Sequence, residues 1–154
     1  MVIEERPVDD PGLSALLGAA FAELVARYGP EGRSAVHEEA RYLVASVDGV
    51  AVGCGAVQPA GPSVGELKRM FVLPDYRGRG IARKLVVALE DLAGAMGCHT
   101  LLLATGVRQP EAIALYERCG YVPVERYGKY VDQPLTRCFH KPLPEGTTAG
   151  AWSS

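Results

Sequence analysis

The segment that is most informative about the architecture spans residues 72–82 and reads Val72-Leu73-Pro74-Asp75-Tyr76-Arg77-Gly78-Arg79-Gly80-Ile81-Ala82. A strand candidate precedes it and a helical period of apolar residues follows it. This order presents free backbone N–H groups and the positive end of a helix dipole to an anion. Gly78 and Gly80 permit close approach of the backbone, and Arg77 and Arg79 add positive charge. We therefore expect this turn to bind phosphate.

Two familiar nucleotide-binding loops do not fit these residues. The Walker A loop requires Gly-Lys-Ser/Thr, whereas Gly80 is followed by Ile81 and Ala82. The dinucleotide fingerprint requires a third glycine where Arg83 stands. Taken alone, the turn is therefore either a phosphate site of another kind or an ordinary solvated turn before a helix.

The remaining elements follow from periodicity and from turn residues. Asp10-Pro11 is typical of a helix start, and Asp48-Gly49 favours a two-residue hairpin. The continuous apolar run at 99–104 indicates a fully buried strand, and Pro123 places its strand at an edge or a bulge. We expect strands at 2–5, 42–47, 50–57, 64–73, 99–104, 121–125 and 136–141, helices at 11–28, 81–96 and 110–116, and a Pro/Gly loop at 59–62.

Length and composition limit the classes of protein that this chain can be. The 154 residues suit one domain, which we place at residues 1–141, with a flexible tail at 142–154. The net charge of -2 argues against a general nucleic-acid binder, so we expect no nucleic-acid partner. The apolar stretches are too short to span a bilayer, and no secretion signal is visible, so we expect no membrane partner and a cytoplasmic location.

The four cysteines are expected to be reduced packing residues. Each lies inside an apolar run, and no C-x-x-C pair is present, which makes zinc or redox chemistry a weak reading. They are Cys54, Cys98, Cys119 and Cys138.

Residues 72–82 closely resemble the acetyl-coenzyme A signature of the GNAT superfamily of N-acetyltransferases, whose core reads Arg/Gln-x-x-Gly-x-Gly/Ala. A second block, at 109–121, is similar to the family's Asn-x-x-Ala-x-x-x-Tyr-x-x-x-Gly-Phe. Gln109 stands in place of the usual Asn, and Tyr121 in place of Phe. The strong matches cover about residues 64 to 125, and the order of elements over 2–141 fits more loosely.

This resemblance implies an α/β fold, the acyl-CoA N-acyltransferase fold. It consists of a mixed, mostly antiparallel sheet of six or seven strands with helices on both faces, splayed in the middle to admit the pantetheine arm. The strand at 64–73 would offer its backbone to pantetheine, while Leu67 and Phe71 are buried on one face. The coenzyme-binding residues implied are Met70, Phe71, Val72, Arg77, Gly78, Arg79, Gly80, Ile81, Ala82, Gln109 and Tyr116.

Acyl transfer to an amine requires a neutral amine, stabilisation of an oxyanion and a proton for the leaving thiolate. By resemblance, Tyr116 supplies that proton, and its alternative is core packing. Glu66 matches a carboxylate that accepts the amine proton, directly or through water. Its alternative is an exposed strand residue, or one that forms a salt bridge with Lys68 on the same face. A backbone N–H near Phe71 or Val72 is a candidate for the oxyanion site. No metal is implied.

Two polar segments are candidates for the acceptor site. The first is the loop at 30–41, where Arg33, His37, Glu38 and Glu39 either bind an acceptor or form a solvated face. The second is 126–134, whose two tyrosines and one glycine suit the wall of a small-molecule site. His99 and His140 lie in strand contexts, where packing or surface roles are expected.

The leading reading is an acetyl-CoA-dependent N-acetyltransferase that acts on a primary amine of a small molecule in a ternary complex. The alternatives are acetylation of a protein N-terminus or lysine, which requires an open groove, and a non-catalytic CoA-binding regulatory protein. The presence of both Glu66 and Tyr116 weighs against the last option. The acceptor, the acyl-chain preference and the oligomeric state stay open, a homodimer being one option.

Overall fold

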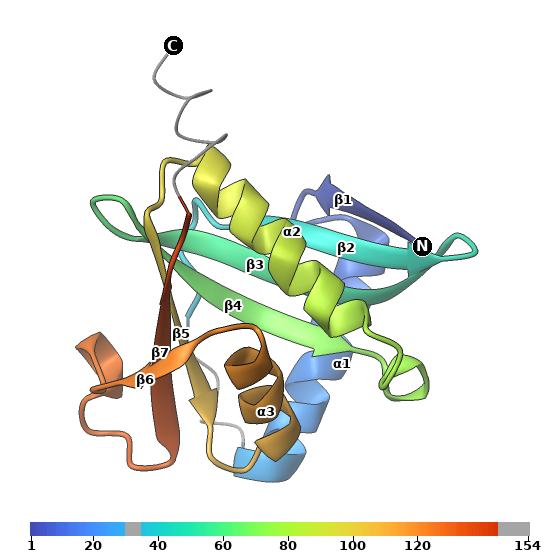
Figure 1. Ribbon diagram of the computed structural model, residues 1–154. Helices are drawn as coiled ribbons and strands as arrows, with labels where there is room; N and C mark the ends of the chain where they lie inside the picture. Colours follow the sequence, from blue (N-terminus) through green and yellow to red (C-terminus); the bar gives the residue numbers. More distant parts are fainter. Residues whose placement is uncertain (30–34, 145–154) are drawn as a thin grey trace.

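One seven-stranded sheet organises the chain, with the strand order β1-β2-β3-β4-β5-β7-β6 (Figure 1). The computed structural model describes residues 1–29 and 35–144. Neighbouring strands are antiparallel except β4 and β5, which run parallel. This confirms the mixed, mostly antiparallel sheet. The strands are β1 (Val2–Arg6), β2 (Arg41–Val47), β3 (Val50–Gly61), β4 (Val64–Val72), β5 (Thr100–Gly106), β6 (Val122–Val124) and β7 (Thr136–Pro142).

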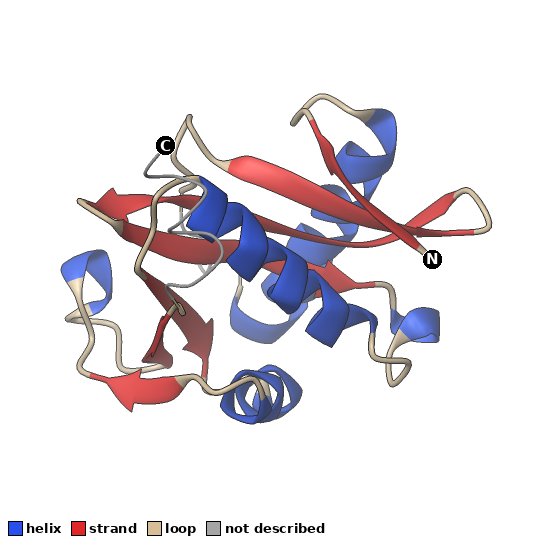
Figure 2. Cartoon of the chain, turned by 45° about the horizontal axis from the view of Figure 1, so that its top comes forward, coloured by secondary structure: helices blue, strands red, loops and turns tan. Residues whose placement is uncertain are grey.

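Three α-helices flank the sheet: α1 (Pro11–Tyr28), α2 (Ile81–Ala95) and α3 (Pro110–Arg118). The Asp10 carboxylate accepts the Leu13 N–H at 2.9 Å, so the predicted cap at the start of α1 is confirmed. α1 lies on one face of the sheet and α2 on the other (Figure 2). Two short 3-10 turns, η1 (Pro74–Tyr76) and η2 (Gly128–Tyr130), complete the described elements. None of the helices in the described part of the chain is long and apolar enough to cross a membrane.

The apolar core forms one cluster on each face of the sheet. The cluster under α2 contains Leu85 and Leu89, both fully buried, and also Tyr116 of α3. The cluster under α1 is smaller and contains Leu13 and Leu16. Each large side chain of this kind contributes roughly 1.5–3 kcal/mol by leaving water. The two clusters pack against the central strands from both faces of the sheet and hold these strands in place.

A β-bulge in β4 corrects one expectation about its side chains. Leu67 belongs to the cluster under α2, whereas Phe71 belongs to the cluster under α1, so the two do not share a face. The pairing of β3 with β4 shifts between Cys54 and Ala56, and Arg69 has a φ of 59° there. One extra residue in a strand reverses the faces of all residues beyond it.

The hairpin between β2 and β3 is confirmed, with Asp48 and Gly49 at φ 51° and 80°. The predicted loop at 59–62 is wrong in part, because β3 continues to Gly61 and Pro59 pairs with Gly65 of β4. The pairing of β3 with β2 stops at Val57. Beyond that point no described strand pairs with this edge of β3, so the missing N–H of Pro59 removes no bond of the described sheet.

The apolar run of β5 predicts burial on both sides of the strand, and this prediction is wrong. Leu101 and Leu103 are buried under α2, whereas Leu102 between them is half-buried, so burial alternates along the strand. β6 forms the outer edge of the sheet, as Pro123 predicted. At the end of β7, Leu143 is buried and its N–H bonds to the His99 carbonyl, while the remainder of the expected tail, from residue 145, lies outside the described residues.

The cysteines fit the expected packing role. Cys54 and Cys138 are buried, Cys98 and Cys119 are half-buried, and all four are free thiols. Burial raises the pKa of the Cys54 thiol to about 12, which keeps it protonated and unreactive. Its Sγ donates to the Arg69 carbonyl at 3.4 Å, so Cys54 also supports the bulge.

The feature that shapes the site is the divergence of β4 from β5 (Figure 1). The two strands pair only from Val64↔Thr100 to Leu67↔Leu103. Beyond Leu67, β4 stays paired with β3, and beyond Leu103, β5 stays paired with β7. The sheet therefore opens into a V, as the resemblance implied, and α3 lies between the diverging ends.

α1 contacts both arms of this V, on the face of the sheet opposite to α2 (Figure 2). On the β4 side, Glu23 forms an ion pair with Arg77 at 2.7 Å. On the β5 side, the Tyr28 hydroxyl accepts the Arg108 N–H at 2.8 Å and lies over Gly106, where a Cβ atom would collide with it. Because only four residue pairs join β4 to β5, these contacts help to set how far the V opens.

Candidate active site

The glycine turn at the end of β4 carries a row of backbone N–H groups that have no partner among the described residues. Gly78 and Gly80 have φ of 78° and 80°, a conformation that glycine adopts without strain. Gly80 caps α2 without a side-chain hydrogen bond. No acceptor within residues 1–29 and 35–144 pairs with the N–H groups of residues 78–83, and the first internal bond runs from Lys84 to the Gly80 carbonyl. Six donors at a helix N-terminus form a cradle of the kind that binds phosphate.

The two arginines of this turn have partners within the protein. Arg77 donates from Nε to the Val72 carbonyl at 2.9 Å and lies over the Phe71 ring as well as beside Glu23. Arg79 donates to the Asp75 carbonyl at 3.1 Å and stacks on the Tyr76 ring. The fit of a pyrophosphate therefore rests first on the backbone, and contact with either guanidinium stays a prediction.

Met70, Phe71 and Val72 form the arm of β4 that faces the opening. They lie beyond the last pair with β5, so the edge of this arm is not covered by that strand. The bulge at Arg69 lies directly before them. An uncovered strand edge offers N–H and C=O groups to an extended ligand, as an added strand would use them.

Tyr116 and Gln109 come from the opposite side of the opening. Gln109 is the N-cap of α3, and its carbonyl accepts the N–H groups of Ala112 and Ile113. Tyr116 is 6% exposed, and its ring meets Tyr121 edge-on with 6.0 Å between centroids. Burial raises the pKa of the Tyr116 hydroxyl, so it carries its proton at neutral pH.

The Tyr116 hydroxyl is carried by a buried residue and has no hydrogen-bond partner in the described protein. Every described side-chain oxygen or nitrogen that is sealed from solvent does have one. The Tyr116 oxygen therefore keeps contact with solvent although its ring is packed. A ring fixed in the core with a protonated, unpaired hydroxyl is suited to donate a proton to a ligand in the opening.

Glu66 lies on β4 at the base of the V, on the face that carries α1. Its side chain is buried, with 6% exposure, and three donors hold it. Gln58 Nε2 donates to Oε1 at 3.2 Å, while the hydroxyls of Tyr127 and Tyr130 donate to Oε2 at 3.2 and 3.0 Å. Hydrogen bonds of this kind compensate a carboxylate for its loss of water.

Lys68 lies two residues further along β4 and does not pair directly with Glu66 in the way that the alternative reading supposed. Its Nζ donates to the Tyr130 hydroxyl at 2.9 Å, so Tyr130 connects the two side chains. Burial lowers the pKa of Lys68 to about 8, with the Glu66 charge acting in the opposite direction. Glu66 and Lys68 do share one face of the strand, as predicted.

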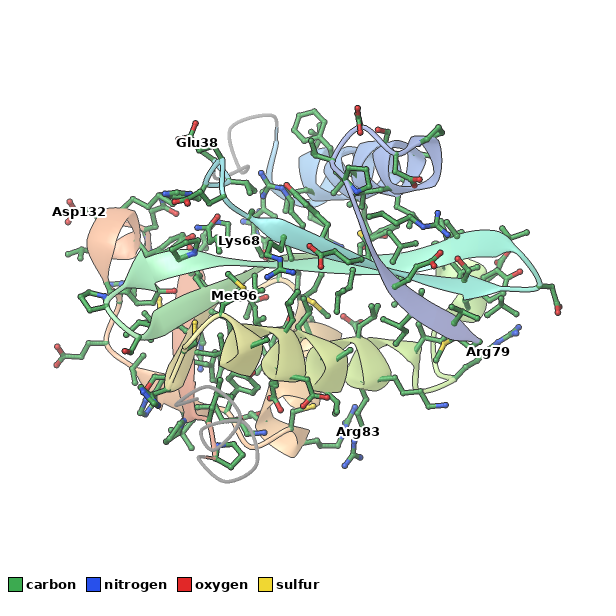
Figure 3. The ribbon with its side chains drawn as sticks, turned by 90° about the horizontal axis from the view of Figure 1, so that it is seen from above. Glu38, Lys68, Arg79, Arg83, Met96 and Asp132 are labelled. Carbon is green, nitrogen blue, oxygen red and sulfur yellow. The ribbon has the colours of Figure 1, made fainter. Side chains whose placement is uncertain are left out.

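The structure brings both acceptor segments to this carboxylate. The turn that contains Tyr127 and Tyr130 covers Glu66, and the His37 N–H donates to Gln58 Oε1 at 2.7 Å. Lys129 Nζ reaches the Ala35 carbonyl at 3.4 Å and joins the two segments. Figure 3 shows Lys68 on the α1 side of the sheet, with Glu38 and Asp132 pointing outward at the rim. Arg33 lies outside the described residues.

Sequence reasoning did not find Gln58 or the pairing of the two tyrosines with Glu66. Tyr127 and Tyr130 are 61 and 64 residues from Glu66 along the chain. Gln58 follows the apolar run of β3 and is 8% exposed, which makes it a buried polar residue in need of a partner. A glutamine inside a strand pattern is the signal that could have found it.

Comparison with known proteins agrees with this geometry. Residues 13–121 match the Acetyltransferase (GNAT) family. An IAA acetyltransferase from Azospirillum brasilense is 45% identical over 104 residues, which are 67% of this chain and 68% of that protein. An uncharacterized N-acetyltransferase from Escherichia coli is 37% identical over 87 residues, 54% of this chain and 52% of that protein.

Solved structures share the whole fold. A protein from Klebsiella pneumoniae assigned as an acyl-CoA N-acyltransferase superposes with a TM-score of 0.81 at 35% identity, covering 93% of this chain and 97% of its own. A GNAT acetyltransferase from Elizabethkingia anophelis with acetyl-CoA bound has a TM-score of 0.71 at 18% identity, over 92% and 97% of the two chains, and shows likeness of fold.

The family match and the shared fold define an acyl-CoA-dependent transferase, and the chain belongs to the GNAT family of acetyltransferases. It is an acetyl-CoA-dependent N-acetyltransferase, as the sequence motifs indicated.

Proposed function

We propose that this protein transfers an acetyl group from acetyl-CoA to a primary amine of a small molecule, with both substrates bound together. The observation that carries the proposal is the enclosure of Glu66 under Tyr127 and Tyr130 at the base of the V. A carboxylate covered by a short turn and by the 35–40 segment suits an acceptor that fits inside. A protein N-terminus or lysine would require an open groove.

The coenzyme site that we propose uses the cradle and the open arm of β4. The backbone N–H groups of the turn hold the pyrophosphate, and the β4 edge pairs with pantetheine. The bound coenzyme supplies an activated acyl group as a thioester. The residues assigned to this site are Met70, Phe71, Val72, Arg77, Gly78, Arg79, Gly80, Ile81, Ala82, Gln109 and Tyr116, with no role for a metal.

Glu66 and Tyr116 hold opposite roles in this proposal. A primary amine is mostly protonated at neutral pH, with a pKa of about 10 by analogy with lysine, and cannot attack until it loses a proton. Glu66 accepts that proton, directly or through water. Tyr116 gives its proton to the leaving thiolate, and burial keeps that proton in place beforehand. A backbone N–H near Phe71 or Val72 binds the oxyanion.

The experiment that tests the proposal follows release of free thiol from acetyl-CoA with a panel of acceptors. The panel contains small primary amines, a peptide with a free N-terminus, a lysine peptide with a blocked N-terminus, and IAA, after which the Azospirillum relative is named. We expect turnover with small amines only. Turnover with peptides alone or IAA alone would contradict the proposed acceptor class, and tight coenzyme binding without any turnover would support the regulatory alternative.

A further inference from the structure

Three side chains form a continuous hydrogen-bonded chain beneath the acceptor site. Lys68 Nζ donates to the Tyr130 oxygen at 2.9 Å, and the Tyr130 hydroxyl donates to Glu66 Oε2 at 3.0 Å. All three residues are buried, with exposures of 6–7%. Groups held this firmly and shielded from water affect one another strongly.

The direction of the Tyr130 hydrogen depends on the charge of Lys68. A charged ammonium has no lone pair and can only donate. The Tyr130 oxygen then accepts a hydrogen bond from the Lys68 ammonium, and the Tyr130 hydrogen points to Glu66. A neutral amine does have a lone pair, so the same hydroxyl is able to turn and donate to Lys68 Nζ instead.

The consequence for Glu66 is a change in basicity. A hydrogen bond to the charged form of a carboxyl group favours that form and makes the carboxylate a weaker base. When Tyr130 turns away, Glu66 keeps only the bonds from Gln58 and Tyr127, and the nearby positive charge is lost as well. Both changes strengthen Glu66 as an acceptor of protons.

We propose that Lys68 is a positioning residue that sets the basicity of Glu66 through the Tyr130 hydroxyl. With Lys68 charged, Tyr130 points to Glu66 and holds it as a weak base. With Lys68 neutral, Tyr130 is released and Glu66 becomes the stronger base. This inference rests on the proposed role of Glu66 in taking a proton from the acceptor, and it concerns the control of that same site.

The surroundings of Lys68 lower its pKa, so that it loses its charge at mildly alkaline pH. Burial lowers the pKa of Lys68 to about 8, the Glu66 charge raises it, and the charges of Lys129 and Arg69 lower it further. Tyr127 also faces Glu66 from the same turn as Tyr130. On the side of β3, the neutral Gln58 amide donates to Glu66. In the 35–40 segment, the His37 main-chain N–H donates to that same Gln58 amide.

The test is a titration followed by nuclear magnetic resonance on the full chain, labelled at glutamate carboxyl carbons and lysine side chains. We expect the Lys68 signal to change with a midpoint near 8. We also expect the Glu66 carboxyl carbon to shift with the same midpoint, because Glu66 loses a donor there. A Glu66 signal that stays flat while Lys68 titrates would overturn the proposal.

Two variants show whether the coupling passes through Tyr130, and Tyr127→Phe is the matched control. Tyr130→Phe should make the Glu66 step clearly smaller, leaving only the direct effect of the Lys68 charge, while Lys68 still titrates. Tyr127→Phe removes a hydroxyl from the same Glu66 oxygen without touching the lysine link, so the step should persist. An unchanged step in Tyr130→Phe would show direct charge coupling and overturn the assigned path.

Lys68→Arg keeps a charge that does not titrate in this range, so it should remove the step. This variant provides the test if Tyr130→Phe does not fold. A Glu66 step that persists in Lys68→Arg would overturn the proposal. The proposed function is tested separately by the turnover of Glu66→Gln, so either idea can fail without the other.

Discussion

Glu23 and Arg77 form an ion pair in which Glu23 Oε2 lies 2.7 Å from Arg77 Nη2. The same guanidinium donates to the carbonyl of Val72, the last residue of β4. The arginine of the coenzyme signature therefore fastens the arm of β4 to α1. This arrangement leaves the backbone N–H groups of the glycine turn as the main donors for a phosphate.

The first prediction concerns this backbone cradle. Gly80→Glu adds bulk and negative charge beside the proposed pyrophosphate site, and it should weaken coenzyme binding at least ten-fold, roughly 1.4 kcal/mol or more. Isothermal titration calorimetry with coenzyme A gives the measurement.

Gly49→Glu is the matched control for backbone strain. Gly49 and Gly80 both have φ of 80°, and a Cβ atom at either position meets nothing within 4 Å. Both variants should lose stability by about 1–2 kcal/mol from the left-handed conformation. Only Gly80→Glu should lose affinity. Equal coenzyme affinity in the two folded variants would remove the turn from the binding site.

The second prediction concerns Tyr116. Tyr116→Phe removes a hydroxyl with no partner in the described protein, so the free energy of unfolding should change by less than about 0.5 kcal/mol. If the hydroxyl protonates the leaving thiolate, kcat should fall by up to about 10²-fold, near the lower end for general acid catalysis, because a thiolate leaves readily. Coenzyme affinity should hold.

Tyr121→Phe provides the opposite pattern as a control. Its hydroxyl donates to Glu90 Oε2 at 2.9 Å, so removing it should cost roughly 1–3 kcal/mol of stability. Its kcat should stay near that of the wild type. If Tyr116→Phe turns over at the full rate, Tyr116 is a packing residue, like its neighbour.

The third prediction follows from the lowered pKa of Lys68, about 8 against the ordinary 10.5. Between these values the unfolded chain binds more protons at this position than the folded chain does. Stability from Lys68 therefore rises with pH across this range. Against Lys68→Met, the wild type should gain up to roughly 3 kcal/mol from pH 8 to 10.5. Urea unfolding at several pH values measures the difference, and a constant difference would mean that Lys68 titrates normally.

Much of the fold could be predicted from local sequence. Asp10-Pro11 and Asp48-Gly49 fix their helix start and hairpin turn through their own backbone preferences, which need no information from elsewhere in the chain. The bulge at Arg69 could not be predicted, because neither Arg nor its neighbours favour a positive φ. It arises where β4 is held by β3 on one side and has left β5 on the other.

The site was predictable where one segment holds it and not where distant segments meet. The glycine turn and Tyr116 lie inside continuous motifs. The partners of Glu66 come from β3 and from the 127–130 turn, and no local pattern says that two tyrosines reach across the sheet to one carboxylate. Only the three-dimensional arrangement shows that the Tyr130 hydroxyl lies between Lys68 and Glu66.

The measurement that tests the central claim most directly is the pH dependence of the rate for Glu66→Gln. The His37 N–H bonds to Gln58 Oε1, which orients the Gln58 amide so that Nε2 faces residue 66. In Glu66→Gln, the new side-chain NH2 group meets a donor that now bonds to the Glu66 carboxylate. Folding and coenzyme affinity must therefore first be shown unchanged. With a small primary amine as acceptor, the variant should lose about 10²-fold or more near neutral pH. The deficit should shrink in alkali, where the free amine is abundant. A loss by the same factor at every pH, or no loss, would contradict Glu66 as the group that takes the amine's proton.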